Sequence, residues 1–137
     1  GSGILSITAL LLGAEHATGV DIDPKAEAVA YENAALNGIG KDRYTVLVGD
    51  VLSNGALREA LGGGYDVVVA NIVADVIIWM APSFKRFLAK DGTLIVSGII
   101  AERSGEVIAA LERSGFAVKE FTESEDWAVV TLCHASL

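Results

Sequence analysis

The sequence predicts an α/β fold, a doubly wound and mostly parallel sheet that ends in an antiparallel hairpin. Segments rich in β-branched residues alternate with helical segments that end at glycine, which is the pattern of strand, helix and parallel strand. The last two strand-like segments, 116–124 and 126–134, have only a short turn between them. A parallel pair needs a crossover of about a dozen residues or more, so these two strands form a hairpin.

The first helical segment, 4–12, is apolar nearly all round, which predicts a buried helix with Gly13 as its C-terminal cap. A short strand, 16–23, follows, and it ends in acidic residues. Pro24 then suits the first position of a helix over 24–38, with Asp23 as the N-terminal cap. The chain therefore begins with a helix, a strand and a second helix.

The same alternation continues to the C-terminus. A helix over 74–89 carries Pro82, which predicts a kink or a break there. We find no repeat or linker, so the whole chain, 1–137, is predicted to be one domain. The further elements are strands over 43–50, 65–72 and 92–100 and helices over 56–61 and 104–115.

Composition limits the partners of the chain. The net charge is −8, from 18 acidic and 10 basic residues, and no stretch gathers lysine and arginine. Direct nucleic-acid contact is therefore not expected. A cationic ligand or a basic protein would be favoured electrostatically, although acidic composition also serves solubility alone.

Other sequence features point to a cytoplasmic, metal-free domain. No apolar run reaches the roughly 20 residues of a membrane span, so no membrane contact is expected. Cys133 is the single cysteine, which excludes an internal disulfide, fits a reducing compartment and suggests a buried strand residue. The two histidines, His16 and His134, have no partners at the spacing of metal ligands.

Polar residues follow the predicted parallel strands at their carboxyl ends, where open α/β sheets bind ligands. Asp21 stands 18 residues after Gly3, near the spacing at which an acid after a glycine turn binds ribose hydroxyls. Ser6 stands where a dinucleotide fingerprint would have glycine or alanine, which disfavours nicotinamide binding. The residues at the strand ends are Asp21, Asp23, Asp50, Asn71, Ser97 and Gly98.

The motifs in order resemble those of class I S-adenosylmethionine-dependent methyltransferases: GSGILSI, GVDIDP, NAALNG, VGDVL, DVVVANIVADVI and GTLIVSGI. The segments ANIVADVI, SGII and EDWAVV resemble, more narrowly, the PrmA-type family that methylates large-subunit ribosomal protein eleven. The resemblance covers essentially the whole chain. It implies a Rossmann-like catalytic domain that uses S-adenosyl-L-methionine and releases S-adenosyl-L-homocysteine.

The resemblance also implies roles for individual residues. Gly1 and Gly3 match the loop whose backbone approaches the methionine part of the cofactor. Asp21 matches the acid that binds the ribose, and Asp50 the acid that contacts the adenine amino group. Asn71 matches the position beside the transferred methyl group, so it is the expected catalytic residue and also touches the cofactor.

The substrate implied by the resemblance is a ribosomal protein, methylated on a lysine side chain or an N-terminal amine. Enzymes that methylate planar nitrogens carry Asn-Pro-Pro-Tyr where this chain has Asn-Ile-Val-Ala at 71–74, which favours an aliphatic amine. Ile72, Ser97 and Trp127 are the candidate substrate-binding residues. The alternatives are a small-molecule acceptor, or a non-catalytic domain that binds the cofactor weakly or not at all.

The hairpin geometry gives Trp127 a place at the ligand-binding edge, because the turn before it lies there if 116–122 runs parallel to the sheet. Trp127 would wall the acceptor pocket, or would pack against a neighbouring helix instead. Glu123, Glu125 and Asp126 would attract a lysine, or would form a solvated turn.

The chain begins inside the glycine motif, with no strand before it. We expect the strand that carries this loop, the central one of the sheet, to precede Gly1 in a longer protein. The family's separate substrate-gripping domain is likewise not found in these 137 residues. The sequence predicts neither the oligomeric state nor which amines are methylated.

Overall fold

A computed structural model describes residues 1–136 of the chain, which divides into two compact units. The first unit spans Gly1–Leu61, and the second begins at Gly62. Each unit contains parallel strands that alternate with helices, so the predicted α/β class is confirmed. The strands belong to two sheets, one in each unit.

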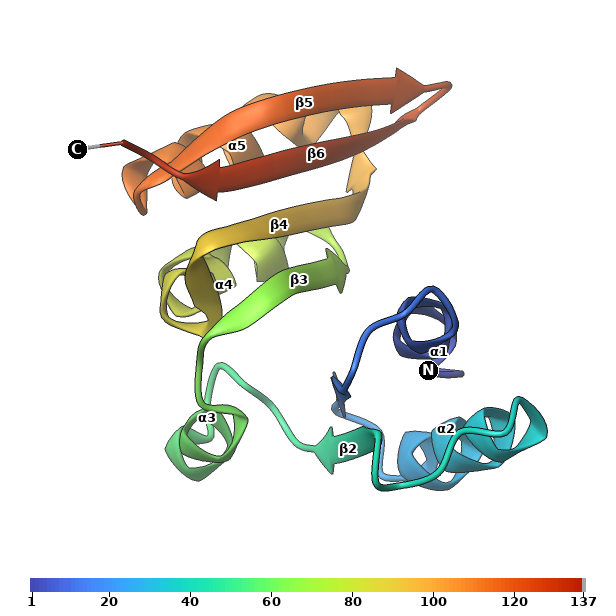
Figure 1. Cartoon of the computed structure of the whole chain (residues 1–137). Helices are drawn as coiled ribbons and strands as arrows, with labels where there is room; N and C mark the ends of the chain where they lie inside the picture. The colour runs from blue at the N-terminus through green and yellow to red at the C-terminus, as the bar shows by residue number, and fades with distance from the viewer. Residues whose placement is uncertain (137) are drawn as a thin grey trace. The chain divides into compact units, whose positions relative to one another are not determined.

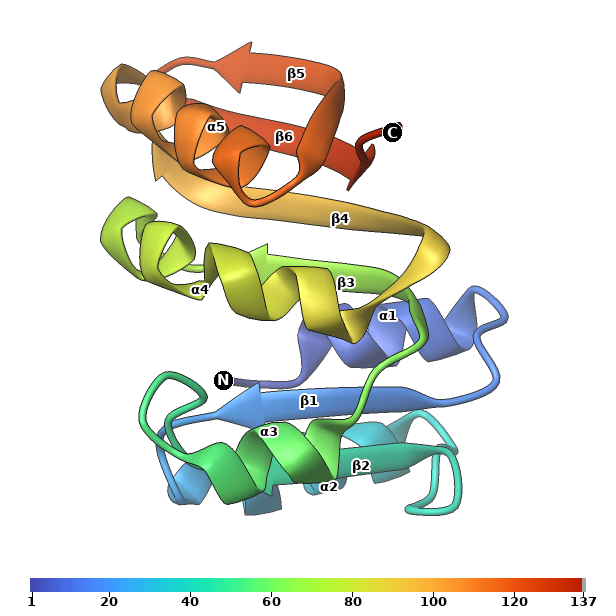
Figure 2. The same cartoon turned by 90° about the vertical axis from the view of Figure 1, so that its left-hand side faces the viewer.

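The first unit is a two-stranded parallel sheet with helices on both faces (Figures 1 and 2). The two strands pair in register from Ala17 opposite Tyr44 to Asp21 opposite Val48. Helices α1 and α2 lie on one face and α3 on the other. The elements are α1 (Ile4–Leu11), β1 (Ala17–Asp21), α2 (Lys25–Leu36), β2 (Tyr44–Val48) and α3 (Gly55–Leu61).

The core of the first unit joins α1 and α2 to β2. Small alanines on α2 let the helix approach the strand closely, and the Tyr31 and Tyr44 rings meet edge to face at 5.8 Å. Arg43 closes the C-terminal end of α1, because its guanidinium donates to the carbonyls of Leu10 (3.2 Å) and Ala14 (3.0 Å). The buried core residues are Ile7, Leu10, Ala30, Ala34, Ile39, Tyr44 and Val46.

The prediction that the first helix is buried all round is wrong. Ile7 and Leu10 are buried, but the other apolar side chains are exposed, with Leu12 83% and Ile4 68% accessible. The helix itself and its end at Gly13, which has φ +115°, are as predicted. The described residues therefore cover one face of α1, and its remaining apolar face is open.

The second unit is a four-stranded mixed sheet in the order β3-β4-β6-β5. Strand β4 pairs parallel with β3 and antiparallel with β6, and β5 pairs antiparallel with β6, as the predicted hairpin requires. Figures 1 and 2 show α4 and α5 on the same face of this sheet. The elements are β3 (Tyr65–Asn71), α4 (Ala74–Phe87), β4 (Leu88–Ile100), η1 (Ala101–Arg103), α5 (Ser104–Arg113), β5 (Phe116–Ser124) and β6 (Trp127–His134).

The core of the second unit lies between the sheet and these two helices. Alternate residues of β6 are fully buried, as the period of two in a strand requires, and in β4 a register shift between Val96 and Ile99 interrupts this period. Ile77 of α4 and Val107 and Leu111 of α5 are fully buried as well. The buried strand residues are Leu94, Val96, Ile99, Ala128, Val130 and Leu132.

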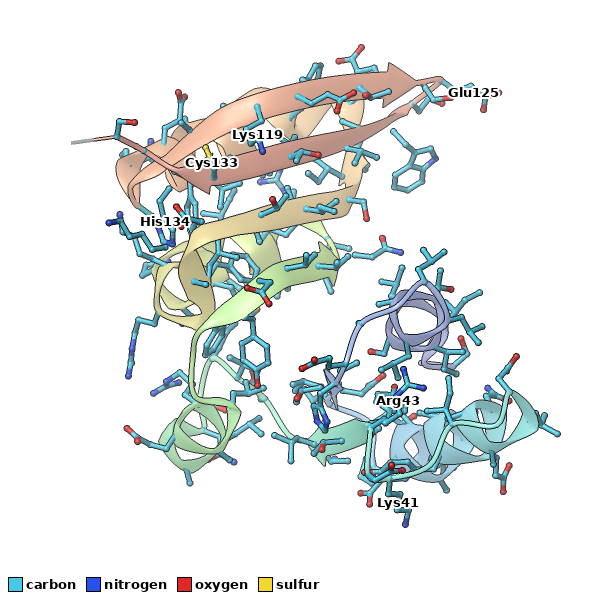
Figure 3. All side chains as sticks on the ribbon, in the orientation of Figure 1. Lys41, Arg43, Lys119, Glu125, Cys133 and His134 are labelled. Atoms are coloured by element: carbon cyan, nitrogen blue, oxygen red, sulfur yellow. The ribbon has the colours of Figure 1, made fainter. Side chains whose placement is uncertain are left out.

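The end of β6 closes onto the start of β4. The His134 ring stacks on Phe116 at 5.5 Å, and its Nε2 lies 3.1 Å from the Leu88 carbonyl oxygen. Cys133 lies in β6 beside His134 (Figure 3), but it is half-buried and not buried as predicted, because alternation along β6 places it on the face opposite to the buried Ala128, Val130 and Leu132.

The regions around Pro82 and Leu88 differ from the sequence prediction. Pro82 lies inside α4, and the helix continues beyond it to Phe87 without a break. Strand β4 begins at Leu88, four residues before the predicted start, because Leu88 pairs with Tyr65 and the register then shifts before Thr93 pairs with Val67. The strand expected before Gly1 stays a prediction.

Candidate functional site

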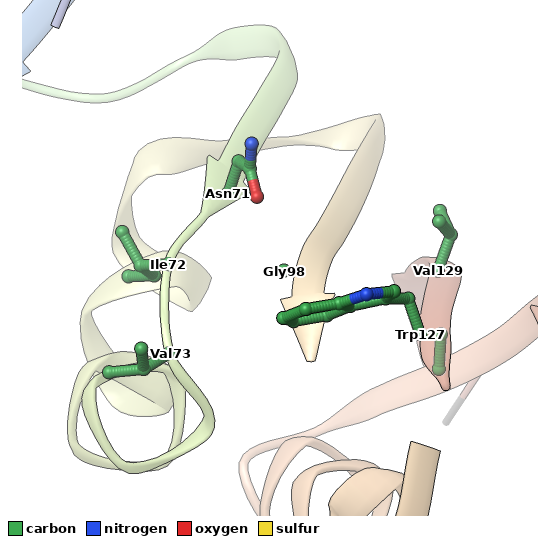
Figure 4. A pocket seen from close by; sticks show the side chains of 7 residues that line it. Asn71, Ile72, Val73, Gly98, Trp127 and Val129 are labelled. Atoms are coloured by element: carbon green, nitrogen blue, oxygen red, sulfur yellow. The ribbon is translucent and has the colours of Figure 1, made fainter. Parts of the chain in front are cut away.

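A pocket of about 420 Å³ opens at one edge of the four-stranded sheet (Figure 4). Three segments form it: the residues that follow β3, the end region of β4, and the start of β6. Asn71, Ile72 and Trp127, all predicted site residues, are thereby brought together. The lining residues are Asn71, Ile72, Val73, Gly98, Trp127, Ala128 and Val129.

The sheet topology explains why these segments meet. Because β3 and β4 are parallel, both approach the same edge, with Asn71 in register opposite Ser97. Because β6 is antiparallel to β4, it begins where β4 ends, with Trp127 opposite Ile100. The site is therefore at the carboxyl ends of the parallel strands, where the sequence predicted it.

Gly98 determines where the Asn71 side chain lies. Its φ of +75° is in the left-handed region, which favours glycine. A β-carbon on this residue would overlap Asn71 Oδ1 and would lie 3.3 Å from the backbone nitrogen of Ile72. Gly98 therefore leaves the space in which the Asn71 carboxamide lies, and Figure 4 shows the two residues facing each other.

The walls of the pocket are apolar apart from Asn71. The Trp127 ring extends from the start of β6 across the end of β4 (Figure 4), and 55% of the residue is exposed. Ile72 and Val73 form the opposite wall, and Val73 is the extended residue that precedes α4. A pocket with one side-chain amide among aliphatic and aromatic surfaces fits a ligand group that is apolar except for a single polar atom.

Two predictions at this edge have different outcomes. Ser97 pairs with Asn71 but is not among the residues that line the pocket, so its substrate-binding role stays a prediction. Glu125 lies at the tip of the β5–β6 hairpin (Figure 3) with φ +56°, and Glu123, Glu125 and Asp126 are exposed. These acids lie in or beside a solvated turn, and their attraction for a lysine stays a prediction.

Sequence reasoning assigned no role to Val73, Gly98, Ala128 or Val129, which also line the pocket. Alternation along β6 gave a usable signal for Val129, since residues 127 and 129 share one face of a strand. Gly98 stood among the strand-end residues, but its conformation and its contact with Asn71 are tertiary features.

The first unit has its own cavity, of about 320 Å³, and two predicted cofactor residues line it. Asp21 Oδ1 accepts a hydrogen bond from the Asp23 backbone N–H at 2.9 Å. A carboxylate can accept two hydrogen bonds from a vicinal diol, and Asp21 lines this cavity. The lining residues are Gly1, Asp21, Asp23, Lys25, Ala26 and Val29.

Gly3 directly precedes α1 and permits close packing against α2 and β2. It has φ +83°, and a β-carbon on it would lie 2.9 Å from the Tyr44 hydroxyl oxygen and 3.2 Å from the Ala30 β-carbon. Any larger residue would therefore push the glycine segment away from α2 and β2.

Asp50 and Asp23 both accept backbone hydrogen bonds. Asp50 Oδ1 accepts from the Leu52 N–H at 2.9 Å, which leaves its second oxygen able to accept from a ligand. Gly49, between the end of β2 and Asp50, donates its N–H to the Asp21 carbonyl oxygen at 2.9 Å. Asp50 therefore lies beside the end of β1. Asp23 Oδ1 accepts from the Lys25 N–H at 2.9 Å, which confirms its capping role.

The described residues contain neither a candidate metal cluster nor a helix that could cross a membrane. Among residues 1–136, no three His, Cys, Asp or Glu side chains cluster in a way that would hold a metal ion. In the same described range, no helix has both the length and the apolar composition of a bilayer-crossing segment.

The matching family model and the curated relatives point to one family. The family model described as ribosomal protein L11 methyltransferase (PrmA) matches residues 1–134. The ribosomal protein L11 methyltransferase of Heliobacterium modesticaldum is 41% identical over 137 residues, which are 100% of this chain and 41% of that protein. The chain therefore spans about two fifths of the length of this relative.

Solved structures share the fold. The ribosomal protein L11 methylase of Lactobacillus delbrueckii subsp. bulgaricus superposes with a TM-score of 0.88 at 30% identity, over 99% of this chain and 67% of that chain. The fibrillarin of Aeropyrum pernix, solved with natively bound S-adenosyl-L-methionine, superposes with a TM-score of 0.70 at 17% identity, over 85% of this chain and 55% of that chain. At that identity the second likeness concerns the fold alone.

Proposed function

The chain belongs to the family of ribosomal protein L11 methyltransferases (PrmA), and from this membership we propose that it performs S-adenosyl-L-methionine-dependent methylation of ribosomal protein L11. The proposed acceptors are amino groups, either lysine side chains or the N-terminal amine. The relatives are longer than this chain, so the grip on the protein substrate is proposed for the whole protein and methyl transfer for this part of it. A ribosomal substrate and a single unpaired cysteine support a cytoplasmic location.

One observation carries the proposal: a single amide, Asn71, lies in an otherwise apolar pocket at the carboxyl edge of a sheet. Trp127 is the one aromatic residue of the lining, so a planar substrate would not be held between two rings. The lining also contains no charged side chain. Such a pocket suits the aliphatic stem of a lysine, with one hydrogen-bond acceptor for its nitrogen.

The residues of the first unit fit the proposed cofactor in their chemistry. Asp21 lines the cavity of the first unit together with Gly1, and a carboxylate can accept hydrogen bonds from both hydroxyls of a ribose. We assign the ribose to Asp21, the adenine amino group to Asp50, and the methionine part to the backbone at Gly1 and Gly3. When bound, S-adenosyl-L-methionine supplies an electrophilic methyl group on a sulfonium and leaves as S-adenosyl-L-homocysteine.

The side chains of the pocket prepare the acceptor amine. A free lysine is an ammonium ion with a pKa near 10.4, and it must release a proton to solvent before its nitrogen becomes a nucleophile. The apolar surfaces of Ile72, Val73 and Trp127 disfavour its charged form, which lowers this pKa. Asn71 Oδ1 then accepts a hydrogen bond from the neutral amine and holds its lone pair in one direction, so alignment contributes much of the rate.

The test is mass spectrometry of ribosomal protein L11 after incubation with the intact protein and S-adenosyl-L-methionine. We expect whole methyl groups on lysine or N-terminal amines, found by peptide sequencing, and little transfer by the Asn71→Ala variant. A panel of small amines provides the comparison. Transfer to small amines with none to L11 would contradict the proposed substrate, and no transfer to either would contradict the proposed reaction.

A further inference from the structure

We propose that Arg103 is a positioning residue that holds the two walls of the Asn71 pocket at a fixed separation. It belongs to η1, the short turn that follows β4, and it does not line the pocket itself. The inference rests on the proposed function where it is tested by the rate of methyl transfer. Its second test, the fluorescence of Trp127, does not depend on that function.

The first contact joins Arg103 to the wall formed by Ile72 and Val73. Arg103 Nη1 lies 2.7 Å from Asp75 Oδ1. Asp75 is in the first turn of α4, two residues after Val73. A shift of this helix end would therefore move the apolar wall, and the ion pair opposes such a shift.

Glu106 fixes the direction of the Arg103 side chain. Arg103 Nη2 lies 2.9 Å from Glu106 Oε2, and Nε lies 3.4 Å from Oε1, so the guanidinium contacts both carboxylate oxygens. Glu106 is in the first turn of α5. The planar fork of an arginine can meet two carboxylates at once, which the single ammonium of a lysine does poorly.

The same short segment holds the wall that carries Trp127. The Ala101 N–H, at the start of η1, donates to the Asp126 carbonyl oxygen at 2.8 Å. Asp126 is the turn residue directly before Trp127. The buried Ser104 hydroxyl donates to the Ala101 carbonyl oxygen at 2.7 Å, which fixes the turn from its other side.

These contacts form one continuous path from wall to wall. It runs from α4 through Asp75 and Arg103 into η1, and from Ala101 through Asp126 to Trp127. The Arg103 side chain is 35% exposed, so it is partly covered where it meets its two carboxylate partners. Because the pocket must align an amine with a methyl group, a small change in wall separation changes the transfer rate.

The variants are Arg103→Gln, which removes the charge, and Arg103→Lys, which keeps it but loses the fork. Arg113→Gln is the matched control, since Arg113 is exposed at the other end of α5 and has no ion pair in the described structure. Asp75→Asn breaks the path at α4 alone. Circular dichroism and thermal melts verify that each variant is folded.

The catalytic readout separates positioning from a general loss of stability. We expect Arg103→Gln and Asp75→Asn each to lower kcat/KM for L11 about fivefold, the scale of an exposed charge network, with the Kd of S-adenosyl-L-homocysteine unchanged. The double variant should lose little more than either single variant, because both break one path. Additive losses, or an equal loss in Arg113→Gln, would overturn the inference.

The structural readout uses Trp127 fluorescence of the 137-residue chain in a Trp79→Phe background, which leaves Trp127 as the one tryptophan among these residues. We expect Arg103→Gln to increase acrylamide quenching of Trp127 and Arg103→Lys to restore it only in part, with the control unchanged. If neither the parent protein nor any variant methylates L11, the proposed function is wrong, but the quenching measurement still tests the path. Quenching that is identical in all variants would overturn the path itself.

Discussion

Gly98 and Asn71 face each other across the edge of the four-stranded sheet so closely that a β-carbon on Gly98 would overlap Asn71 Oδ1. The glycine also has a left-handed backbone, with φ +75°. Two independent requirements, space and conformation, therefore select glycine beside the proposed catalytic amide.

Substituting Gly98 should damage catalysis more than folding. In Gly98→Ala, the new methyl group displaces the Asn71 carboxamide, and we expect kcat to fall roughly 100-fold, as for other small displacements of a reacting group. Steady-state kinetics with L11 measures this loss. The matched control is Gly105→Ala on α5, where a β-carbon would meet open space, so this variant should keep its activity. Equal kinetics for the two variants would contradict the role assigned to Gly98.

Asp21 should contribute to cofactor affinity. Asp21→Ala removes the carboxylate that we assign to the ribose, so we expect binding of S-adenosyl-L-homocysteine to weaken by about 2 kcal/mol, the scale of hydrogen bonds to a charged group. Calorimetric titration of the intact protein measures the affinity. Asp23→Ala, which removes a helix cap, should instead cost about 1 kcal/mol of folding stability. An unchanged affinity in Asp21→Ala would remove Asp21 from the ribose.

The Arg103–Glu106 pair should make stability depend on acid pH. Hydrogen bonding and charge attraction from Arg103 hold the pKa of Glu106 below its ordinary value of 4.5. A carboxyl group whose pKa is lowered by folding stabilises the protein above its unfolded pKa, and this contribution is lost as pH falls through its folded pKa.

The expected result is that Glu106→Gln has a lower Tm than the parent protein at neutral pH, and that the difference disappears as the pH falls below 4.5. Thermal melts across this range measure it. Glu112→Gln, on the same helix without an ion pair in the described residues, serves as the control. A Tm difference that persists undiminished at the acid end would contradict the assignment.

Arg43 should stabilise the first unit. Its guanidinium bonds two carbonyls at the end of α1, so Arg43→Met should lower the free energy of unfolding by about 2 kcal/mol. Lys41→Met is the comparison, because Lys41 lies 4.5 Å from the centre of the Tyr31 ring and its contribution should be about 0.5 kcal/mol. Urea titration of both variants measures the difference, and equal losses would contradict this role of Arg43.

Much of the fold could be predicted because its signals are local. Turn glycines, β-branched runs and the short connection before Trp127 predicted every strand and α-helix of the described residues to within a few residues, but not the short helix η1. The exposure of Ile4 and Leu12 could not be predicted. An apolar helical segment indicates that its side chains favour burial, but it does not indicate which of them the described residues bury. The early start of β4 depends on pairing between Leu88 and Tyr65, which is a tertiary contact.

Site residues at the ends of strands could be predicted from the sequence, whereas the contacts between them could not. Asn71 and Trp127 follow from topology, since one ends a parallel strand and the other begins an antiparallel one. The contact between Gly98 and Asn71 depends on backbone conformation, and the Arg103–Asp75 ion pair joins residues 28 positions apart (103 minus 75). Neither relationship has a local sequence signal.

The central claim is that Asn71 positions the acceptor amine, and single-turnover transfer to L11 at saturating S-adenosyl-L-methionine tests it most directly. Asn71→Ala removes the only amide of the pocket lining, so we expect the transfer rate to fall about 100-fold or more while the Kd of S-adenosyl-L-homocysteine stays nearly unchanged. An Asn71→Ala protein that transfers methyl groups to L11 at the parent rate would contradict the account.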